Sequence, residues 1–237
     1  LEKIEDFEML EVAGPGFLNF NISKDTWFKF LSQLLETNLL FNEEIGLNKN
    51  INVEYVSANP TGPLHIGHCR GAVFGDVLSN LLKVTGHNVT KEYYINDAGT
   101  QIDTLANSTI IRIKEIINSK SEENYPDDFY PGEYLIDIAK KIIDKYGTSI
   151  LESDNHFSTI KSECVNLLLE NIKEDLSKLS INQDIFVSEK ELITQGKIDK
   201  TIDQLKNMNL IYEGILDKPK GKQIDDWEPR KQLLFKS

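Results

Sequence analysis

The first forty residues carry an alternating pattern followed by a helical one. Apolar and polar residues alternate weakly in residues 1–22 on both sides of the turn Gly14-Pro15-Gly16, which predicts two short strands. Ser23 is suited to cap a helix, and apolar residues then recur at helical spacing up to residue 40. We therefore expect a pair of strands and then a connecting helix that packs on the core.

The pattern between residues 51 and 86 predicts a strand, a tight loop and a helix. Residues 51–56 are rich in β-branched and aromatic side chains, and the run is short enough for a buried strand. Pro60, Gly62 and Pro63 then exclude both helix and sheet, so the chain must turn. The apolar residues that follow recur at helical spacing and predict an amphipathic helix that ends near Gly86. They are Ile66, Val73, Val77, Leu78, Leu81 and Leu82.

A second strand and a second helix follow, over residues 88–95 and 99–118. Strand, helix and strand in this order imply a right-handed parallel unit, which binds ligands at the carboxyl ends of its strands. The loop after the first strand and the loop after the second both lie at that edge. In the second loop, Asn96 or Asp97 is either the N-cap of the following helix or, with Gln101, part of a site. The sequence thus predicts an α/β fold.

Residues 119–197 differ in character and predict a mostly helical insertion. An acidic, proline-bearing surface loop over residues 121–132 introduces it. Further on, a hairpin-like pair is expected around Glu213-Gly214, and the basic run Lys218–Lys222 fits a hairpin turn. The helices predicted after residue 132 cover residues 133–146, 158–180, 188–195 and 198–214.

Composition limits the class of protein. With 237 residues, of which 40% are hydrophobic, the chain is long enough to bury a core. No apolar run approaches the roughly 20 residues of a membrane span, and no N-terminal segment is typical of secretion. Two cysteines are too few for a disulfide framework or a cysteine-rich zinc site and fit a reducing cytoplasm. The net charge of −12 opposes a broad nucleic-acid surface on this chain, because phosphate contacts need clustered lysine and arginine.

Two histidines at the predicted helix start are the candidate catalytic residues. His65 and His68 are three residues apart, so both imidazoles can lie on one helix face and donate hydrogen bonds to phosphate oxygens. Gly67 between them leaves room for a base or ribose. The helix start adds its free N–H groups and the positive end of its dipole. Four residues of this kind occur by chance in many proteins, but the strand, loop and helix around them favour a functional role.

The stretch from Glu54 to His68 resembles the signature of class I aminoacyl-tRNA synthetases. The tetrapeptide His65-Ile-Gly-His68 is common to that class, whereas the preceding Ser57-Ala-Asn-Pro-Thr-Gly-Pro63 is typical of the arginyl-tRNA synthetases. Residues 93–102 and 226–237 are similar to the same family. The resemblance implies a Rossmann-like class I synthetase catalytic core, of which this chain holds the first half, with a mostly helical connective insertion.

The resemblance also implies a reaction and its partners. The carboxylate of L-arginine attacks the α-phosphate of ATP, which carries Mg²⁺, and arginine then passes from the adenylate to its tRNA. We expect a cytoplasmic, monomeric enzyme with no membrane contact and no metal held by the protein itself. The ATP-binding residues implied are Pro63, His65, Gly67 and His68. The arginine-binding residues implied are Glu54, Ser57 and Asn59, although for Glu54 a half-buried structural carboxylate is an equal alternative.

By the same resemblance, the chain divides into five segments. They are the tail of an additional N-terminal domain (1–22), a connecting helix (23–47), the first half of the core (48–118), the connective insertion (119–197) and a return towards the core (198–237). The Lys-Met-Ser-Lys loop of the class is absent from the sequence, so we expect these residues alone to be inactive. Two alternatives stay open: a non-catalytic nucleotide- or protein-binding module derived from a synthetase, and a small-molecule adenylyltransferase of the same superfamily.

Overall fold

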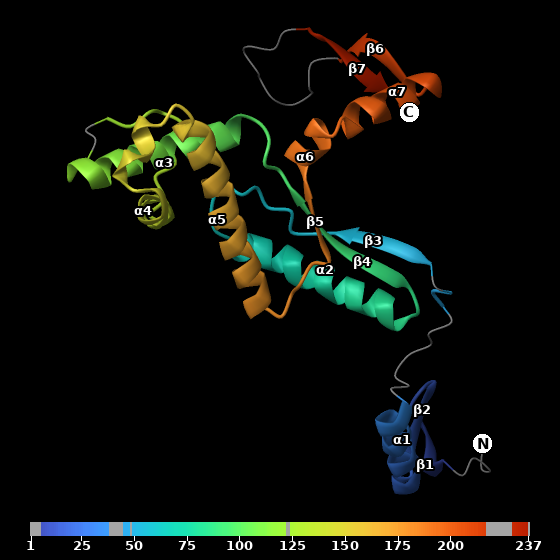
Figure 1. Ribbon diagram of the computed structural model, residues 1–237. Coiled ribbons are helices and arrows are strands. Elements are labelled where there is room, and N and C mark those ends of the chain that lie inside the picture. The colour runs from blue at the N-terminus through green and yellow to red at the C-terminus, as the bar shows by residue number, and fades with distance from the viewer. Residues whose placement is uncertain (1–5, 38–44, 48, 122–123, 217–228, 237) are drawn as a thin grey trace. The chain divides into compact units, whose positions relative to one another are not determined.

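The computed structural model describes residues 6–37, 45–47, 49–121, 124–216 and 229–236 (Figure 1). The chain divides into two compact units, Leu1–Ile51 with Val77–Val89, and Asn52–Asp76 with Thr90–Ser237. The turn predicted at Lys218–Lys222 lies outside the described residues. In the described part of the chain, no helix combines the length and the hydropathy needed to cross a lipid bilayer.

The first unit begins with an antiparallel hairpin and a helix. β1 (Phe7–Ala13) pairs with β2 (Phe17–Ile22), which confirms the two predicted strands. The helix α1 (Lys24–Thr37) begins as predicted, because the N–H of Thr26 donates to Oγ of Ser23 at 3.2 Å.

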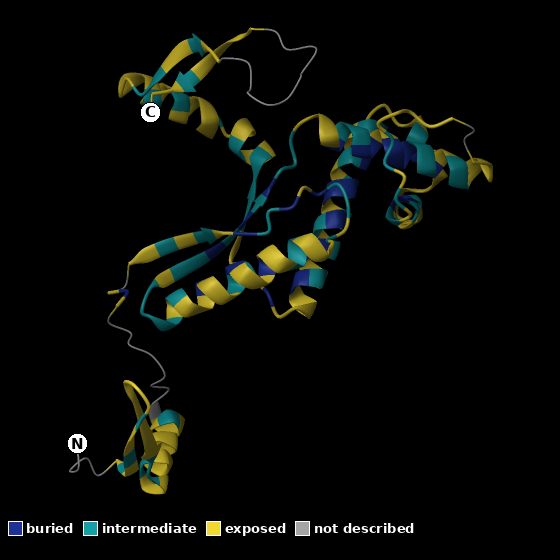
Figure 2. Cartoon of the chain, turned by 180° about the vertical axis from the view of Figure 1, so that it is seen from behind, coloured by how far each residue is buried: buried dark blue, intermediate teal, exposed yellow. Residues whose placement is uncertain are grey.

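The apolar stripe of α1 is largely exposed. Phe28 and Leu35, two residues of its apolar stripe, are 65% and 89% exposed. Figure 2 shows most of β1, β2 and α1 as exposed surface. Two short strands offer little apolar area for a helix face of this size, so helical spacing predicted the helix correctly but not the burial of its stripe.

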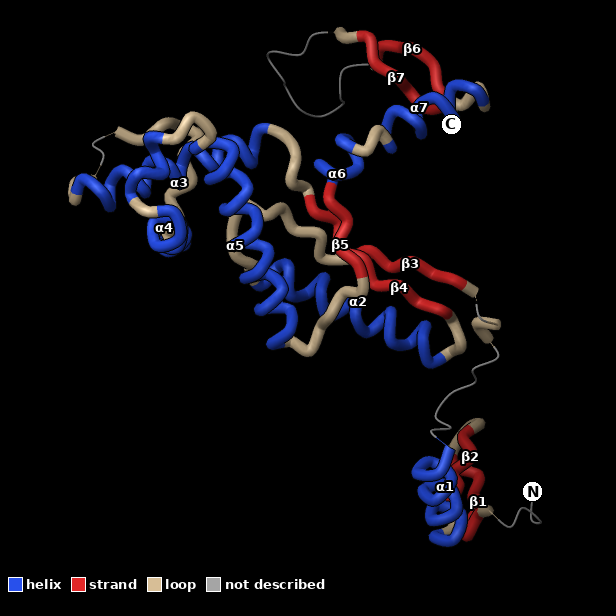
Figure 3. The backbone as a smooth tube through the Cα atoms, viewed as in Figure 1, coloured by secondary structure: helices blue, strands red, loops and turns tan. Residues whose placement is uncertain are grey.

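The central part of the chain is built on a parallel sheet with the strand order β3-β4-β5 (Figure 3). The strands are β3 (Asn50–Glu54), β4 (Asn88–Ile95) and β5 (Ile185–Ser188). β4 and β5 are parallel, with Glu92 opposite Ile185. β3 runs the same way, because the N–H of Asn88 donates to the carbonyl of Lys49 and the N–H of Tyr55 to that of Glu92. The helix α2 (Ile66–Val84) connects β3 to β4, which confirms the predicted parallel unit.

The helix α2 buries a different face from the one its apolar stripe predicts. Ile66 and Val73 of that stripe are exposed, whereas Ala72, Gly75 and Ser79 are buried. Gly75 lies directly against the side chain of Tyr55, where a Cβ atom would come within 2.5 Å of the tyrosine Cβ. Close approach of the helix to this ring requires small residues. The face of α2 that carries them is therefore buried instead of the face that carries the apolar stripe.

Three further helices form the largest apolar core. They are α3 (Thr100–Asn118), α4 (Tyr134–Tyr146) and α5 (His156–Lys178), close to the predicted ranges. α3 packs against both of the others. The helix α5 joins two cores: Leu168 lies among the residues of α3 and α4, while Ile172 and Leu176 pack with Tyr93 of the sheet. The helical layer is thereby fixed to the sheet.

The C-terminal region contains α6 (Glu189–Thr194), α7 (Lys197–Asn207), β6 (Ile211–Ile215) and β7 (Lys231–Phe235). The hairpin predicted around Glu213-Gly214 is wrong, because both residues lie inside β6, which pairs with β7. The predicted helix over residues 198–214 is too long. It stops at Asn207, and Asn209 follows with a φ of 56°, a left-handed conformation that ends helices.

Candidate active site at the carboxyl edge of the sheet

The loop that follows β3 starts with two residues in the left-handed region of backbone space. Val56 has a φ of 68° and Ser57 a φ of 39°. This conformation is rare for any residue with a side chain and strained for a β-branched one. Oγ of Ser57 accepts a hydrogen bond from the N–H of Tyr94 at 3.0 Å, which ties the strained turn to β4. The hydroxyl of Ser57, a predicted arginine contact, therefore has a structural partner.

Two tyrosines hold the next part of the loop by its carbonyls. The hydroxyl of Tyr93 donates to the carbonyl of Ala58 at 2.8 Å, and the hydroxyl of Tyr134 to that of Thr61 at 2.6 Å. Burial raises the pKa of each tyrosine to about 12, so both stay protonated donors at neutral pH. The sequence alone did not single out Tyr134, which comes from the start of α4.

The two histidines predicted to act together lie face to face. The rings of His65 and His68 are stacked, with centroids 3.7 Å apart and planes inclined by 22°. Nδ1 of His65 accepts from the N–H of Gly67 at 3.1 Å, and Nδ1 of His68 from the N–H of His65 at 3.3 Å. A ring nitrogen that accepts a hydrogen bond carries no proton, so each neutral ring carries its proton on Nε2. The pair therefore offers two N–H donors from the Nε2 atoms.

The charge state of His68 follows from its surroundings. Burial, and then the nearness of His65, lower the pKa of His68 below its usual value. His68 is therefore neutral at pH 7. The backbone N–H groups predicted to face a phosphate are partly occupied, because Gly67 donates to the ring of His65 and His68 donates to the carbonyl of His65 at 2.8 Å. In this geometry the Nε2–H groups of the two imidazoles are donors available at the helix start.

Gly67 fits against the His65 ring. A Cβ atom at this position would lie 3.0 Å from Cε1 of His65, tighter than an ordinary contact. A side chain at this position would therefore displace the His65 ring. Whether Gly67 also leaves room for a base or ribose stays a prediction.

The structure joins two of the predicted site loops directly. Nδ2 of Asn59 donates to Oε1 of Gln101 at 2.9 Å, so the loop after β3 meets the first turn of α3. Both side chains are exposed and have further hydrogen-bonding capacity, as a substrate contact requires. Pro63, the remaining predicted ATP contact, is also exposed on this loop.

Asp97 does not cap α3 but bonds to residues of β5 and α6. The N-cap of α3 is Gly99, which makes no side-chain capping bond, so neither Asn96 nor Asp97 caps that helix. The carboxylate of Asp97 accepts from Oγ of Ser188 at 2.6 Å and from the N–H of Lys190 at 2.9 Å. It thereby supports the start of α6, whose N-cap is Ser188, and binds the loop after β4 to the end of β5.

Carboxylates from all three strand ends act electrostatically on the hydroxyl of Tyr94. Burial raises the pKa of Tyr94, and Glu189, Asp97 and Glu54 raise it further. Glu54 is exposed, which contradicts the alternative of a half-buried structural carboxylate. The described residues contain no group of three or more histidine, cysteine or acidic side chains arranged to hold a metal ion. The edge is therefore an acidic surface that attracts cations through charge.

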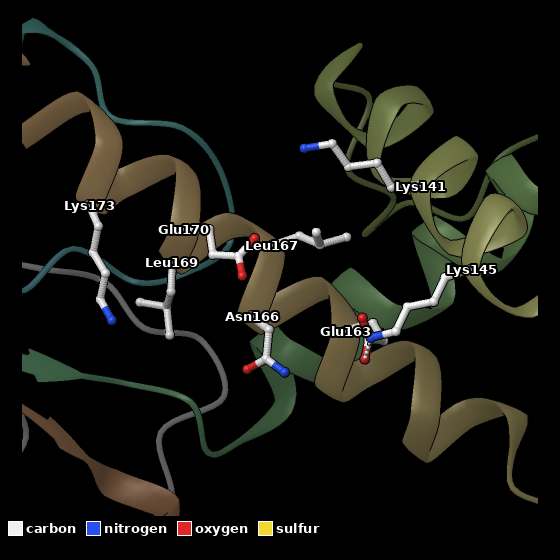
Figure 4. Close-up of a pocket in the computed structure, with 8 residues that line it drawn as sticks. All are labelled: Lys141, Lys145, Glu163, Asn166, Leu167, Leu169, Glu170 and Lys173. Atoms are coloured by element: carbon white, nitrogen blue, oxygen red, sulfur yellow. Dashed lines mark hydrogen bonds and ion pairs between the residues drawn. The ribbon is translucent and has the colours of Figure 1, made fainter.

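A separate cavity of about 400 Å³ lies between α4 and α5 (Figure 4). Lys141 and Lys145 come from α4, and Lys173 from α5, but Lys145 pairs with Glu163 at 2.8 Å. None of the lining residues belongs to the loop between β3 and α2. Its lysines alternate with carboxylates, so the cavity has no strong preference for an anion, and the candidate active site lies at the sheet edge.

Comparisons with known proteins give a consistent result. The family model for the catalytic domain of "tRNA synthetases class I (R)" matches residues 30–221. The arginine–tRNA ligase of Wolbachia pipientis wMel is 48% identical over 237 residues, which is 100% of this chain and 41% of the relative. That of Rickettsia bellii strain OSU 85-389 is 46% identical over 240 residues, again 100% of this chain and 41% of the relative.

Among solved structures, a Campylobacter jejuni chain assigned as an arginyl-tRNA synthetase is similar, with a TM-score of 0.70 and 37% identity. The match covers 81% of this chain and 42% of the other. The chain thus spans about two fifths of the length of the curated relatives that it matches. These matches confirm the resemblance and the class I α/β catalytic fold predicted from the sequence.

Proposed function

We propose, because the chain belongs to the catalytic-domain family of class I arginine tRNA synthetases, that it supplies the ATP-binding part of an arginine–tRNA ligase active site. In this reaction a carboxylate oxygen of arginine attacks the α-phosphorus of ATP, and the bond from that phosphorus to the bridging oxygen of pyrophosphate breaks. The 3′-terminal ribose hydroxyl of arginine tRNA then attacks the arginyl carbonyl, and AMP leaves.

The stacked histidine pair is the observation that carries this proposal. His65 and His68 each present an Nε2–H, and both rings lie at the start of α2. Two donors fixed side by side suit the oxygens of one phosphate chain, on which negative charge develops during attack at the α-phosphorus. Mg²⁺ enters with ATP as part of the substrate, bound to phosphate oxygens.

Arginine binding is supported by the acidic edge beside the histidines. Glu54 is exposed at the end of β3 and offers a carboxylate to the α-ammonium or the guanidinium of the substrate. Asn59 and Gln101 lie side by side within reach of the same edge and can orient the substrate by hydrogen bonds. We infer that Ser57, Asn96 and Asp97 shape this edge, with the hydroxyl of Ser57 still free to donate.

The larger enzyme implied by the relatives would act on arginine tRNA in the cytoplasm. The net charge of −12 opposes the binding of tRNA over a broad surface by these residues alone. We therefore assign most tRNA contacts to sequence that the relatives have beyond this match. The segment boundaries given above and the monomeric state are part of the same proposal.

Intact mass, ATP binding and pyrophosphate exchange test the proposal together. The exchange assay contains arginine, ATP, Mg²⁺ and arginine tRNA, and His65→Ala is compared with His156→Ala, a histidine at the start of α5. Because the imidazole bonds a charged phosphate, His65→Ala should weaken ATP binding about tenfold or more, and His156→Ala should not. For a protein of exactly 237 residues we expect ATP binding without charging of tRNA.

The possible outcomes distinguish the proposed ligase from the two alternative functions. Exchange that depends on both arginine and tRNA establishes a ligase. ATP binding without exchange is the result expected for half of an active site if the protein's mass equals this sequence, and it favours the nucleotide-binding module if the protein is longer. Exchange with another small acid in place of arginine favours the adenylyltransferase. No ATP binding, or equal binding by the two histidine variants, refutes the role given to the pair.

A further inference from the structure

Tyr134 joins the helical layer to the loop that carries the candidate site. Its ring is partly buried against the core of α3, α4 and α5, while its hydroxyl donates to the carbonyl of Thr61 at 2.6 Å. Thr61 lies 73 residues earlier in the sequence, in the loop between β3 and α2. The ring also lies over Gly62, where a Cβ atom would be 3.5 Å from the tyrosine oxygen.

The segment held in this way is short and follows two strained residues. Tyr93 bonds the carbonyl of Ala58 and Tyr134 bonds that of Thr61, so the two tyrosines fix both sides of Asn59 and Pro60. The strained residues at 56 and 57 immediately precede this segment. A strained loop keeps its conformation only where surrounding contacts determine it fully. Loss of either hydroxyl removes one of the bonds that hold it.

The local sequence is adapted to seat Tyr134. A Cβ atom at Gly132 would come within 2.5 Å of Cδ1 of the tyrosine, so only glycine allows the ring this place. The N–H of Leu135 donates to the carbonyl of Gly132, which closes the turn into α4. The position of α4 therefore sets the position of the hydroxyl.

We propose that Tyr134 is a positioning residue, which holds the loop between β3 and α2 so that Asn59, His65 and His68 keep their binding geometry. This inference rests on the proposed function where it concerns ATP. It does not depend on that function where it concerns the loop. It gives the helical insertion a direct mechanical connection to the candidate site.

The test compares Tyr134→Phe with Tyr146→Phe in the full chain. Tyr146 ends the same helix and also loses one phenolic hydrogen bond, to Glu163 at 2.9 Å, but lies outside the loop contacts. The chain has four histidines, so the Cε1–H signals of His65 and His68 in NMR spectra can be read beside those of the other two. A second readout is the affinity for a fluorescent ATP analogue.

For Tyr134→Phe we expect shifted His65 and His68 signals, unchanged signals of His87 and His156, and a three- to tenfold weaker ATP affinity. Tyr146→Phe should match the wild type in both readouts. If no variant and not even the wild type binds ATP, while Tyr134→Phe still shifts only the two loop histidines, the proposed function fails and the positioning role stands. Loop histidine signals that do not move in Tyr134→Phe overturn the inference.

If Tyr134→Phe reduces folding yield, Gly132→Ala provides the second variant. It keeps the hydroxyl but displaces the ring, and it should shift the same two histidine signals. Uniform shifts of all four histidines would show a general loss of structure and would contradict a specific role for Tyr134.

Discussion

Two glycines in α2 allow a test of how the histidine-bearing helix is fixed. Gly71 and Gly75 lie one turn apart in α2, and replacement by alanine improves helix propensity equally at both. A Cβ atom at Gly71 meets nothing within 4 Å. A Cβ atom at Gly75 would come within 2.5 Å of Cβ and Cδ2 of Tyr55, at least 0.9 Å closer than ordinary contacts, which begin at 3.4 Å.

The two substitutions should therefore have opposite effects on stability. Gly71→Ala should raise the free energy of unfolding by about 0.5–1 kcal/mol, the usual gain for a glycine in a helix interior. Gly75→Ala should lower it by about 1–3 kcal/mol, because overpacking forces backbone movement. The atoms it meets include the first side-chain carbon of Tyr55, which cannot rotate away. Movement of α2 would also stretch the 3.2 Å hydrogen bond from Tyr55 to Asp76.

Urea unfolding followed by circular dichroism measures both free energies, provided that the slopes with denaturant agree. A double-mutant cycle with Tyr55→Ala identifies the clash, since removal of the ring should reduce the penalty of Gly75→Ala. Equal stabilities of Gly71→Ala and Gly75→Ala would refute the reasoning, because the contact with Tyr55 would then have no cost. The same outcome would remove the explanation given for the buried face of α2.

Three other measurements test the core and its charges. Leu168→Ala should lower the free energy of unfolding by about 2–5 kcal/mol, measured by urea titration, because Leu168 is fully buried between helices. A thiol reagent at pH 8 should label half-buried Cys69 but not Cys164 until the protein unfolds, because burial raises the pKa of Cys164 to about 11. The hydrogen bond from Lys145 lowers the pKa of Glu163 below 4.5, so this bond stabilises the fold above pH 4.5 and its contribution disappears as the pH falls through the lowered pKa. The difference in unfolding free energy between wild type and Glu163→Gln should accordingly be constant from pH 6 to 8 and shrink in acid; a constant difference down to pH 3 would contradict it.

The periodicity of apolar residues predicted the helices and strands that are determined by their own sequence. The strand at residues 88–95 and the helices of the insertion lie close to the expected ranges, because their periodicity is strong and their cores are apolar. The hairpin expected at Glu213-Gly214 failed because β6 pairs with β7, which is 16 residues further along the chain, and turn residues do not reveal a distant partner. The prediction of which face of α2 is buried failed for a similar reason, because contact with the ring of Tyr55 determines that face.

The sequence indicates a candidate site where one short stretch carries it. His65 and His68 stand out by their spacing and by the turn residues around them, whereas Asn59 comes from the family resemblance, and the roles of all three stay predictions. Tyr134 was missed because its partner is 73 residues away, and a lone tyrosine at a helix start is no signal. Asp97 was correctly placed at the sheet edge, but its partner Ser188 is 91 residues away and could not be anticipated.

The carboxyl edge is a connected network before any substrate arrives. Each strand end is tied to the next by at least one side-chain hydrogen bond, and each bond joins a loop at this edge to a neighbouring strand or helix. Adenylyl transfer depends on positioning and on donors already aimed at developing charge, because reorganisation during reaction is costly. A network that fixes the loops in the free protein therefore suits the proposed chemistry better than flexible loops would. The three bonds are Tyr94 to Ser57, Asn59 to Gln101, and Ser188 to Asp97.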